Sequence, residues 1–301
     1  MQKTCIAVCG PTASGKTALS LTLAEYFSTS ILSFDSRQCY KELNLGVAKP
    51  SPEELSRIKH FFINSHHISD LVTAALFERY GSECLENIFI DNDIAILVGG
   101  TGLYLKALLE GLDDIPPTHP SFRKQVNDLY ENKGLPALQE ALHELDPFYF
   151  STTDIQNPRR LMRALEVCLQ TGKAYSSFVT RSRKETNFNT ILIAPDIPRQ
   201  ELYERINTRV IEMVKAGLEA ETASLTGFRD LPSLQTVGYS EWFEYFDGKI
   251  TREEAIREIM KNTRNYAKRQ LTWFRKQNGI HWIPPGTDII QFTQNLLKLN
   301  S

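Results

Sequence analysis

The chain has 301 residues, a formal net charge of −2 at pH 7 and 42% hydrophobic residues. A chain of this length can bury a sizeable core, either as one large domain or as a core with an inserted domain. The near-neutral charge argues against a general nucleic-acid binder, and the sequence shows neither a signal-peptide pattern nor an apolar run that could span a bilayer, so we expect a cytoplasmic enzyme.

The first predicted elements are a strand over Thr4 to Cys9 and a helix over Ala18 to Phe27. Between them stands GPTASGKT, the pattern of a phosphate-binding loop. Backbone N–H groups of such a loop, together with the N-terminus of the following helix, form an anion cradle. The predicted phosphate-binding residues are Gly10, Pro11, Thr12, Ala13, Ser14, Gly15, Lys16 and Thr17.

Two of these residues have specific expected roles. The Lys16 ammonium adds a cation, and the Thr17 hydroxyl is a ligand for Mg²⁺, the one cofactor that we expect. The loop alone leaves its ligand open, because nucleotides, pyrophosphates and phosphosugars all present the same oxygen atoms.

Two further strands are predicted over Ile31 to Phe34 and Asp93 to Val98. The first is followed by Asp35, and the second runs into GGTGLY, which contains Thr101, and then into a helical pattern. Alternating strands and helices predict a parallel sheet, which binds ligands beyond the carboxyl ends of its strands. Both residues are therefore expected at the same edge as the phosphate-binding loop.

The chemistry of this edge has alternatives. Asp35 is a candidate general base, with a helix cap or a magnesium ligand as the other interpretations. Thr101 is a candidate ligand contact or a helix N-cap. The strand before Thr101 ends in Gly99 and Gly100, where many ATPases carry an acidic magnesium ligand, and no NKxD sequence occurs. These features weaken a motor or switch interpretation.

From Asp113 onward the sequence changes. DDIPPTHPSF is a Pro-rich break, and residues 123 to 170 have the pattern of helices joined by short polar turns. TILIAPD, which begins after Asn189, returns to a strand pattern, and a helix follows from Arg199. We therefore predict an α/β fold with a P-loop-type parallel sheet core, helices on both of its faces, and an inserted all-helical domain. The expected parts are residues 1–112, 113–188 and 189–301.

Two basic stretches stand out on this near-neutral chain. Residues 259–276 carry six bases and no acidic residue, and residues 157–184 carry Arg159, Arg160, Arg163, Lys173, Arg181, Arg183 and Lys184 against Glu166 alone. Each stretch is explained either by a solvated helix face or by a surface that binds a polyanion at a defined place.

Taken in chain order, the motifs resemble one family, the bacterial tRNA dimethylallyltransferases, also called tRNA isopentenyltransferases. The resemblance rests on GPTASGKT, SFDSRQCY with GVAKP, SHHISD, LVGGTGLY, NPRRLMRALE, LYERINTRV, TVGYSEW and NTRNYAKRQLTWFRK. It implies transfer of a dimethylallyl group from dimethylallyl diphosphate to the exocyclic amine of the adenosine 3′ of the anticodon, with release of pyrophosphate. The implied partner is the anticodon stem-loop of tRNA, and we expect a monomer.

The resemblance also implies residue roles. Asp35 accepts a proton from the adenine amine or orients it, while Thr101 and Arg209 contact the diphosphate near its bridging oxygen. Lys16 and Thr17 hold phosphate and magnesium. The implied tRNA-binding residues are Asp35, Ser36, Arg37, Gln38, Thr101, Arg123, Arg159, Arg160, Leu161, Met162, Arg163, Gln235, Gly238, Tyr239, Arg264, Lys268 and Arg269.

Two positions depart from the family pattern. Phe34 stands where a small residue is usual, and His119 stands where an aspartate is common. Phe34 either narrows the pocket or packs in the core, and His119 is expected at the surface. The rival functions are an isopentenyltransferase that acts on free adenine nucleotides, a P-loop kinase for a small metabolite, and a non-catalytic RNA-binding protein.

Overall fold

The structure is a computed structural model that describes residues 2–180 and 185–299. The chain divides into two compact units, the first made of residues 1–109 and 185–301 and the second of residues 110–184. Three of the predicted basic residues, Arg181, Arg183 and Lys184, lie outside the described residues.

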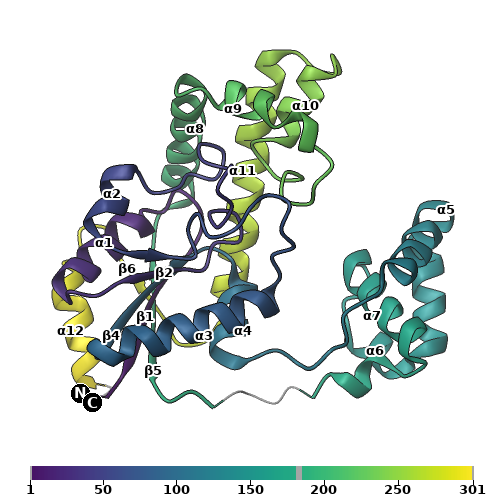
Figure 1. The fold of residues 1–301 in the computed structure, drawn as a ribbon, viewed down its shortest axis with the longest axis horizontal. Coiled ribbons are helices and arrows are strands. Elements are labelled where there is room, and N and C mark those ends of the chain that lie inside the picture. Colours follow the sequence, from purple (N-terminus) through teal and green to yellow (C-terminus); the bar gives the residue numbers. More distant parts are fainter. Residues whose placement is uncertain (1, 181–184, 300–301) are drawn as a thin grey trace. The chain divides into compact units, whose positions relative to one another are not determined.

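The first unit is built on a six-stranded parallel sheet with the strand order β3-β2-β4-β1-β5-β6 (Figure 1). The strands are β1 (Thr4–Cys9), β2 (Ile31–Ser33), β3 (His60–Phe61), β4 (Ile94–Gly99), β5 (Asn189–Pro195) and β6 (Ile280–Ile283). Central strand β1 is buried along its whole length, as expected for a strand covered on both faces. The predicted α/β class with a parallel sheet is confirmed.

Both faces of the sheet are covered by helices (Figure 1). Because side chains alternate along a strand, Ile6 and Val8 pack with α1 (Lys16–Tyr26) and α12 (Ile289–Leu299), whereas Cys5 and Ala7 pack with α3 (Ala74–Asp91) and α4 (Gly102–Glu110). A short helix, α2 (Pro52–Arg57), precedes β3. The carboxyl ends of β1, β2 and β4 thereby open toward the same edge.

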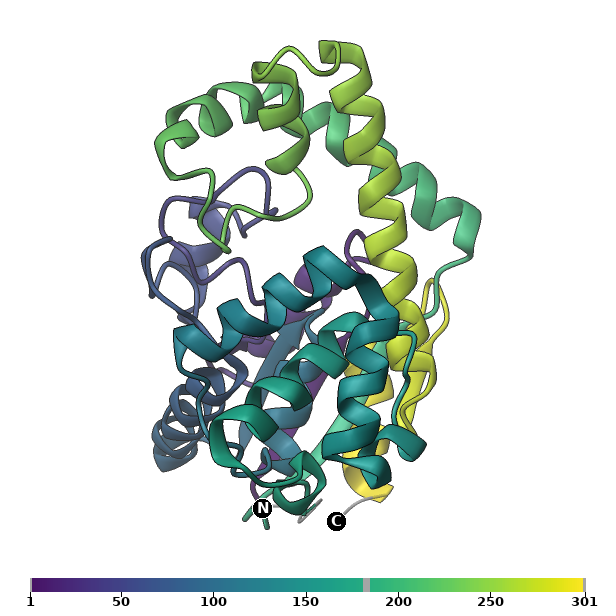
Figure 2. The same ribbon diagram turned by 90° about the vertical axis from the view of Figure 1, so that its right-hand side faces the viewer.

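Five helical segments follow β5 before the chain returns to the sheet. They are α8 (Arg199–Lys215), α9 (Leu218–Ser224), the 3₁₀ turn η2 (Thr226–Phe228), α10 (Ser240–Phe246) and α11 (Arg252–Arg275). Figure 2 shows α8 beside the long helix α11. The Arg264 guanidinium of α11 donates to the Asn207 side chain of α8 at 2.7 Å, which ties the two helices together.

In its described part, the second unit consists of α5 (Pro120–Leu145), α6 (Pro147–Thr152), α7 (Pro158–Thr171) and the 3₁₀ turn η1 (Tyr175–Phe178). Its core contains Val126 and Leu165 among other side chains of the same unit. The helix α5 breaks at Gly134, whose φ of 72° is left-handed. His119 caps α5 by accepting the Ser121 N–H at 3.3 Å, so the imidazole serves where an aspartate is an ordinary cap.

None of the helices within residues 2–180 and 185–299 is both long and apolar enough to cross a bilayer.

Candidate active site

The loop between β1 and α1 curls at the carboxyl end of β1. Gly10, Ala13 and Gly15 all have positive φ values, of 132°, 63° and 85°. The Lys16 Nζ folds back and donates to the carbonyl of Pro11 at 2.5 Å. Gly15 at the N-cap of α1 has no side chain that could accept the first N–H groups of the helix, so these groups are left for a ligand.

The segment after β2 is held by its own aspartate. Asp35 Oδ1 accepts the backbone N–H groups of Arg37 at 2.9 Å and Gln38 at 3.3 Å, which fixes both the turn and the carboxylate. Among the described residues, Asp35 Oδ2 accepts no hydrogen bond. One oxygen therefore holds the segment while the other is left for chemistry.

Thr101 connects this segment to the loop after β4. Its Oγ1 accepts the Ser36 N–H at 3.0 Å and lies 3.2 Å from the Ser36 hydroxyl. Neighbouring Tyr266 of α11 is partly buried, and burial together with the Asp35 carboxylate raises the pKa of its phenol. Tyr266 therefore stays protonated and can donate a hydrogen bond at any physiological pH.

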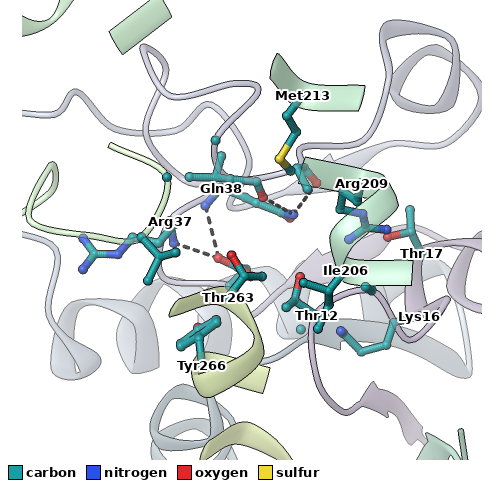
Figure 3. Close-up of a pocket in the computed structure, with 18 of the residues that line it drawn as sticks. Thr12, Lys16, Thr17, Arg37, Gln38, Ile206, Arg209, Met213, Thr263 and Tyr266 are labelled. Carbon is teal, nitrogen blue, oxygen red and sulfur yellow. Dashed lines mark hydrogen bonds between the residues drawn. The ribbon is translucent and has the colours of Figure 1, made fainter. Parts of the chain in front are cut away.

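The phosphate-binding loop, the segment that carries Asp35 and helix α11 line a cavity of about 430 Å³ in the first unit, whereas Thr101 lies outside its lining (Figure 3). Figure 3 shows Lys16, Thr17 and Arg209 on one side and Arg37 and Tyr266 on the other. Among the residues predicted from sequence, the lining contains Thr12, Ala13, Gly15, Lys16, Thr17, Asp35, Ser36, Arg37, Gln38, Arg209 and Gly238. Apolar side chains complete it, among them Val47, Ile206, Val210, Met213 and Ile259.

Two cations that line the cavity, Lys16 and Arg209, have lowered pKa values. Burial lowers the pKa of Lys16 to about 8, an effect that Asp35 offsets and the Arg209 charge increases. Burial also lowers the pKa of Arg209. Each positive charge has lost hydration, so a bound diphosphate would favour both charged forms. A phosphate ligand is the chemistry that this arrangement suits.

Phe34 packs beneath the site and does not line the cavity. Its side chain is fully buried, and a Cβ built on Gly99 would lie 2.5 Å from the Phe34 ring. Of the two roles that the sequence left open, the structure assigns core packing. The neighbouring glycine of β4 provides the space for the ring.

Helix α11 contributes site residues that the sequence analysis did not single out. Thr263, Tyr266 and Gln270 line the cavity, and Gln270 hydrogen-bonds both the phosphate-binding loop and the loop after β4. Their spacing places them on one face of a helix, together with Ile259. That periodicity was a usable signal, but the basic residues on the opposite face dominated the interpretation.

Six of the remaining predicted tRNA contacts are either exposed or fully buried. Arg159, Arg160, Lys268 and Arg269 are exposed, whereas Leu161 and Tyr239 are fully buried. Leu161 belongs to the core of the helical unit, and the Tyr239 hydroxyl donates to Glu221 at 2.7 Å. The structure assigns these last two side chains to packing, and we no longer propose them as RNA contacts.

Several other predicted contacts have internal partners. Arg163 hydrogen-bonds Thr118 and the Pro116 carbonyl, which fixes the Pro-rich segment of the helical unit. Arg123 lies 3.9 Å from Glu166, Gln235 donates to the Arg229 carbonyl at 2.7 Å, and Met162 is partly buried. Nothing in these contacts tests an RNA role.

Comparison with known proteins adds the family. The IPP transferase family model matches residues 38–277. The chain is 46% identical over 300 residues to a tRNA dimethylallyltransferase of Cytophaga hutchinsonii, covering 99% of each chain. It is 47% identical over 277 residues to one of Christiangramia forsetii, covering 92% of each.

Solved structures agree. The full-length tRNA isopentenylpyrophosphate transferase of Bacillus halodurans has a TM-score of 0.72 and 33% identity, with 99% of this chain and 96% of that chain covered. A eukaryotic dimethylallyltransferase acting on tRNA has a TM-score of 0.79 and 25% identity, with coverages of 99% and 77%. The predicted resemblance is confirmed: this chain belongs to the IPP transferase family, that of the tRNA dimethylallyltransferases.

Proposed function

We propose that the protein transfers the dimethylallyl group of dimethylallyl diphosphate to the exocyclic amine of the adenosine 3′ of the anticodon in tRNA. The observation that carries this proposal is a cavity in which two cations, Lys16 and Arg209, share the lining with a carboxylate, Asp35. The names of the relatives support the substrate class, since two of them are tRNA dimethylallyltransferases.

The reaction forms one bond and breaks one. The amine nitrogen bonds to the allylic carbon while the bond from that carbon to the bridging oxygen breaks, and the electron pair leaves with pyrophosphate. Lys16, Arg209 and the N–H groups at the start of α1 stabilise the charge that develops on the leaving group. The amine loses its proton to Asp35, whose carboxylate is oriented by the N–H groups of Arg37 and Gln38.

Thr101 has a positioning part in this scheme. It ties the loop after β4 to the segment that carries Asp35, through the hydrogen bonds with Ser36. An adenine amine is a poor nucleophile, so much of the acceleration comes from orientation. The apolar lining, which includes Val47 and Met213, suits the hydrocarbon part of the donor.

The residues present fit a magnesium ion bound chiefly through diphosphate and water. Within the described chain no three His, Cys, Asp or Glu side chains gather as a metal site, while the Thr17 residue lines the cavity beside Lys16. Thr17 would supply one oxygen ligand. When bound, the ion would neutralise charge on the diphosphate.

For the tRNA, we propose contacts at two exposed basic surfaces, one around Lys268 and Arg269 on α11 and one around Arg159 and Arg160 on α7. Single-stranded loops are the part of RNA that proteins read by sequence, which suits the anticodon loop as the target. The target base must leave its stack to enter the cavity. We expect a monomer that acts in the cytoplasm.

The test uses radiolabelled dimethylallyl diphosphate with magnesium, offered unmodified tRNA in one reaction and AMP with ATP in another. Label on the adenosine beside the anticodon is the expected result. Label on the free nucleotide would keep the chemistry and replace the acceptor. Label in neither acceptor, with phosphoryl transfer from ATP to a small metabolite, would favour the kinase alternative.

A further inference from the structure

Gln270 on α11 lines the cavity and bridges the phosphate-binding loop and the loop after β4. Its Oε1 accepts the Thr12 N–H of the phosphate-binding loop at 2.9 Å, and its Nε2 donates to the Gly100 carbonyl of the loop after β4 at 2.9 Å. The side chain is 7% exposed, so both bonds are shielded from water. One amide thus joins segments that lie far apart in the sequence.

The loop after β4 is shaped to receive α11 on both sides of Thr101. A Cβ built on Gly100 would lie 2.1 Å from Gln270 Nε2, and one built on Gly102 would lie 2.4 Å from the Trp273 ring. A side chain at Gly100 would displace the Gln270 amide, and one at Gly102 would collide with the Trp273 ring. The two glycines that flank Thr101 therefore permit the close approach of Gln270 and Trp273.

The chemistry of the bridge demands a neutral amide. One end of the Gln270 side chain must accept from an N–H and the other must donate to a carbonyl, and a carboxamide does both. An ionised carboxylate accepts at both ends, so it would face the Gly100 carbonyl with no hydrogen to offer. It would also place a negative charge beside the loop that binds phosphate.

We propose that Gln270 is a positioning residue for the transfer reaction, and this inference rests on the proposed function. Gln270 holds Thr12 and Gly100 together, and so sets the distance between the phosphate-binding loop and the loop after β4. The loop after β4 carries Thr101, whose bond to Ser36 holds the segment of Asp35. Donor and acceptor are then presented to one another in a fixed geometry.

The decisive variant is Gln270→Glu, with kcat measured against pH for both the variant and the unchanged protein. A protonated carboxyl restores one donor and one acceptor, and the low-dielectric position raises the pKa of such a group. We expect kcat to be at least about tenfold lower than in the unchanged protein at about pH 8, and the ratio of the two kcat values to recover as the pH falls to about 6. A ratio independent of pH overturns the inference.

Gln270→Met provides a second measurement, since it keeps the side-chain volume but makes neither bond. We expect a similar loss of kcat at every pH, with RNA affinity within about threefold of the unchanged protein. Gln277→Glu is the matched control for Gln270→Glu. Gln277 lies just past the end of α11, and within the described chain its side chain makes only a local hydrogen bond, from Nε2 to the Trp273 carbonyl at 3.2 Å. A Met variant with unchanged kcat overturns the inference.

A separate arm keeps this test distinct from the test of the proposed function. If the unchanged protein transfers no label, the proposed function has failed, and binding of inorganic pyrophosphate replaces kcat as the readout. We expect Gln270→Met to bind pyrophosphate at least about threefold more weakly than the unchanged protein. The pyrophosphate affinity of Gln270→Glu should approach that of the unchanged protein as the pH is lowered. Equal affinities for all three proteins would overturn the bridge as a positioning device.

Discussion

At the scale of single residues, the site separates a proton acceptor from an anion cradle. Asp35 uses one oxygen to accept the N–H groups of Arg37 and Gln38, and Lys16 donates one hydrogen bond to the Pro11 carbonyl. Each group is therefore oriented before a substrate arrives, as preorganised catalysis requires.

Asp35→Asn should abolish most of the transfer and leave the segment folded. The asparagine Oδ1 can still accept from Arg37 and Gln38, but the amide cannot take a proton. We expect single-turnover transfer to fall by about 10²-fold or more, and tRNA affinity to change by less than about threefold. A loss of tRNA affinity as large as the loss of rate would make Asp35 a binding residue instead.

Lys16 gives a pH dependence for donor binding. Its pKa of about 8 means that the ammonium is charged below pH 8 and loses its proton above it in the unliganded protein. A diphosphate favours the charged form, so its affinity should be nearly constant between about pH 7 and about pH 8 and fall by up to about tenfold per pH unit above that.

Calorimetric titration with an unreactive dimethylallyl diphosphate analogue checks this expectation. Lys16→Met should bind the analogue more weakly at neutral pH and show no decline of this kind above pH 8. Equal pH profiles for the two proteins would remove Lys16 from the account of the loop.

At the scale of elements, the loop after β2 depends on a carboxylate from α9. Glu221 accepts the N–H groups of Asn44, Leu45 and Gly46 at 3.0 to 3.3 Å, as well as the Tyr239 hydroxyl. The cavity residues that follow, Val47 and Ala48, are held in turn by the Gln38 amide. A helix far along the chain thus supports one wall of the site.

Glu221→Ala should lower the free energy of unfolding by about 2 kcal/mol, because it leaves a buried hydroxyl and several N–H groups without their acceptor. Urea denaturation measures the change. Glu219→Ala on the same helix is the control, since its pair with Arg252 is partly exposed and should contribute less than about 1 kcal/mol. Equal losses for the two variants would contradict the supporting role of Glu221.

The elements visible in the sequence were those with a strong local signal. The phosphate-binding loop and strands β1, β2, β4 and β5 follow from apolar runs and glycine spacing. The strands β3 (His60–Phe61) and β6 (Ile280–Ile283) were missed because two to four residues carry little pattern of their own. Glu221 and Gln270 were missed because their partners are backbone groups more than 150 residues away in the sequence.

At the scale of the whole molecule, two units each expose basic residues. The residues are Lys268 and Arg269 in the first unit and Arg159 and Arg160 in the second. Arg264, also predicted to contact tRNA, already donates its guanidinium to Asn207, so it is a poor choice for testing RNA binding. Such surfaces are distinguished from ordinary solvated faces by the salt dependence of RNA binding.

Replacing Lys268 and Arg269 together by Ala should weaken binding of an anticodon stem-loop. The slope of log affinity against log salt should fall by about 1 for each phosphate that the protein no longer neutralises. Replacing Arg159 and Arg160 should do the same. Lys249→Ala is the control, because that ammonium pairs with Asp247. Filter binding over a salt series measures the slopes, and an unchanged slope for either pair returns that surface to the solvated interpretation.

Helix α11 presents Gln270 to the buried loops and the adjacent Lys268 and Arg269 to solvent. Neighbouring positions on a helix differ in direction by about 100°, so the two faces tolerate different kinds of mutation. Substitutions at Lys268 and Arg269 can retune the outer surface over evolutionary time while the inner face keeps its register. A single residue inserted before Gln270 would rotate the rest of the helix by about 100° relative to the part before the insertion, so the outer face is free to vary in composition while the length of the helix is fixed.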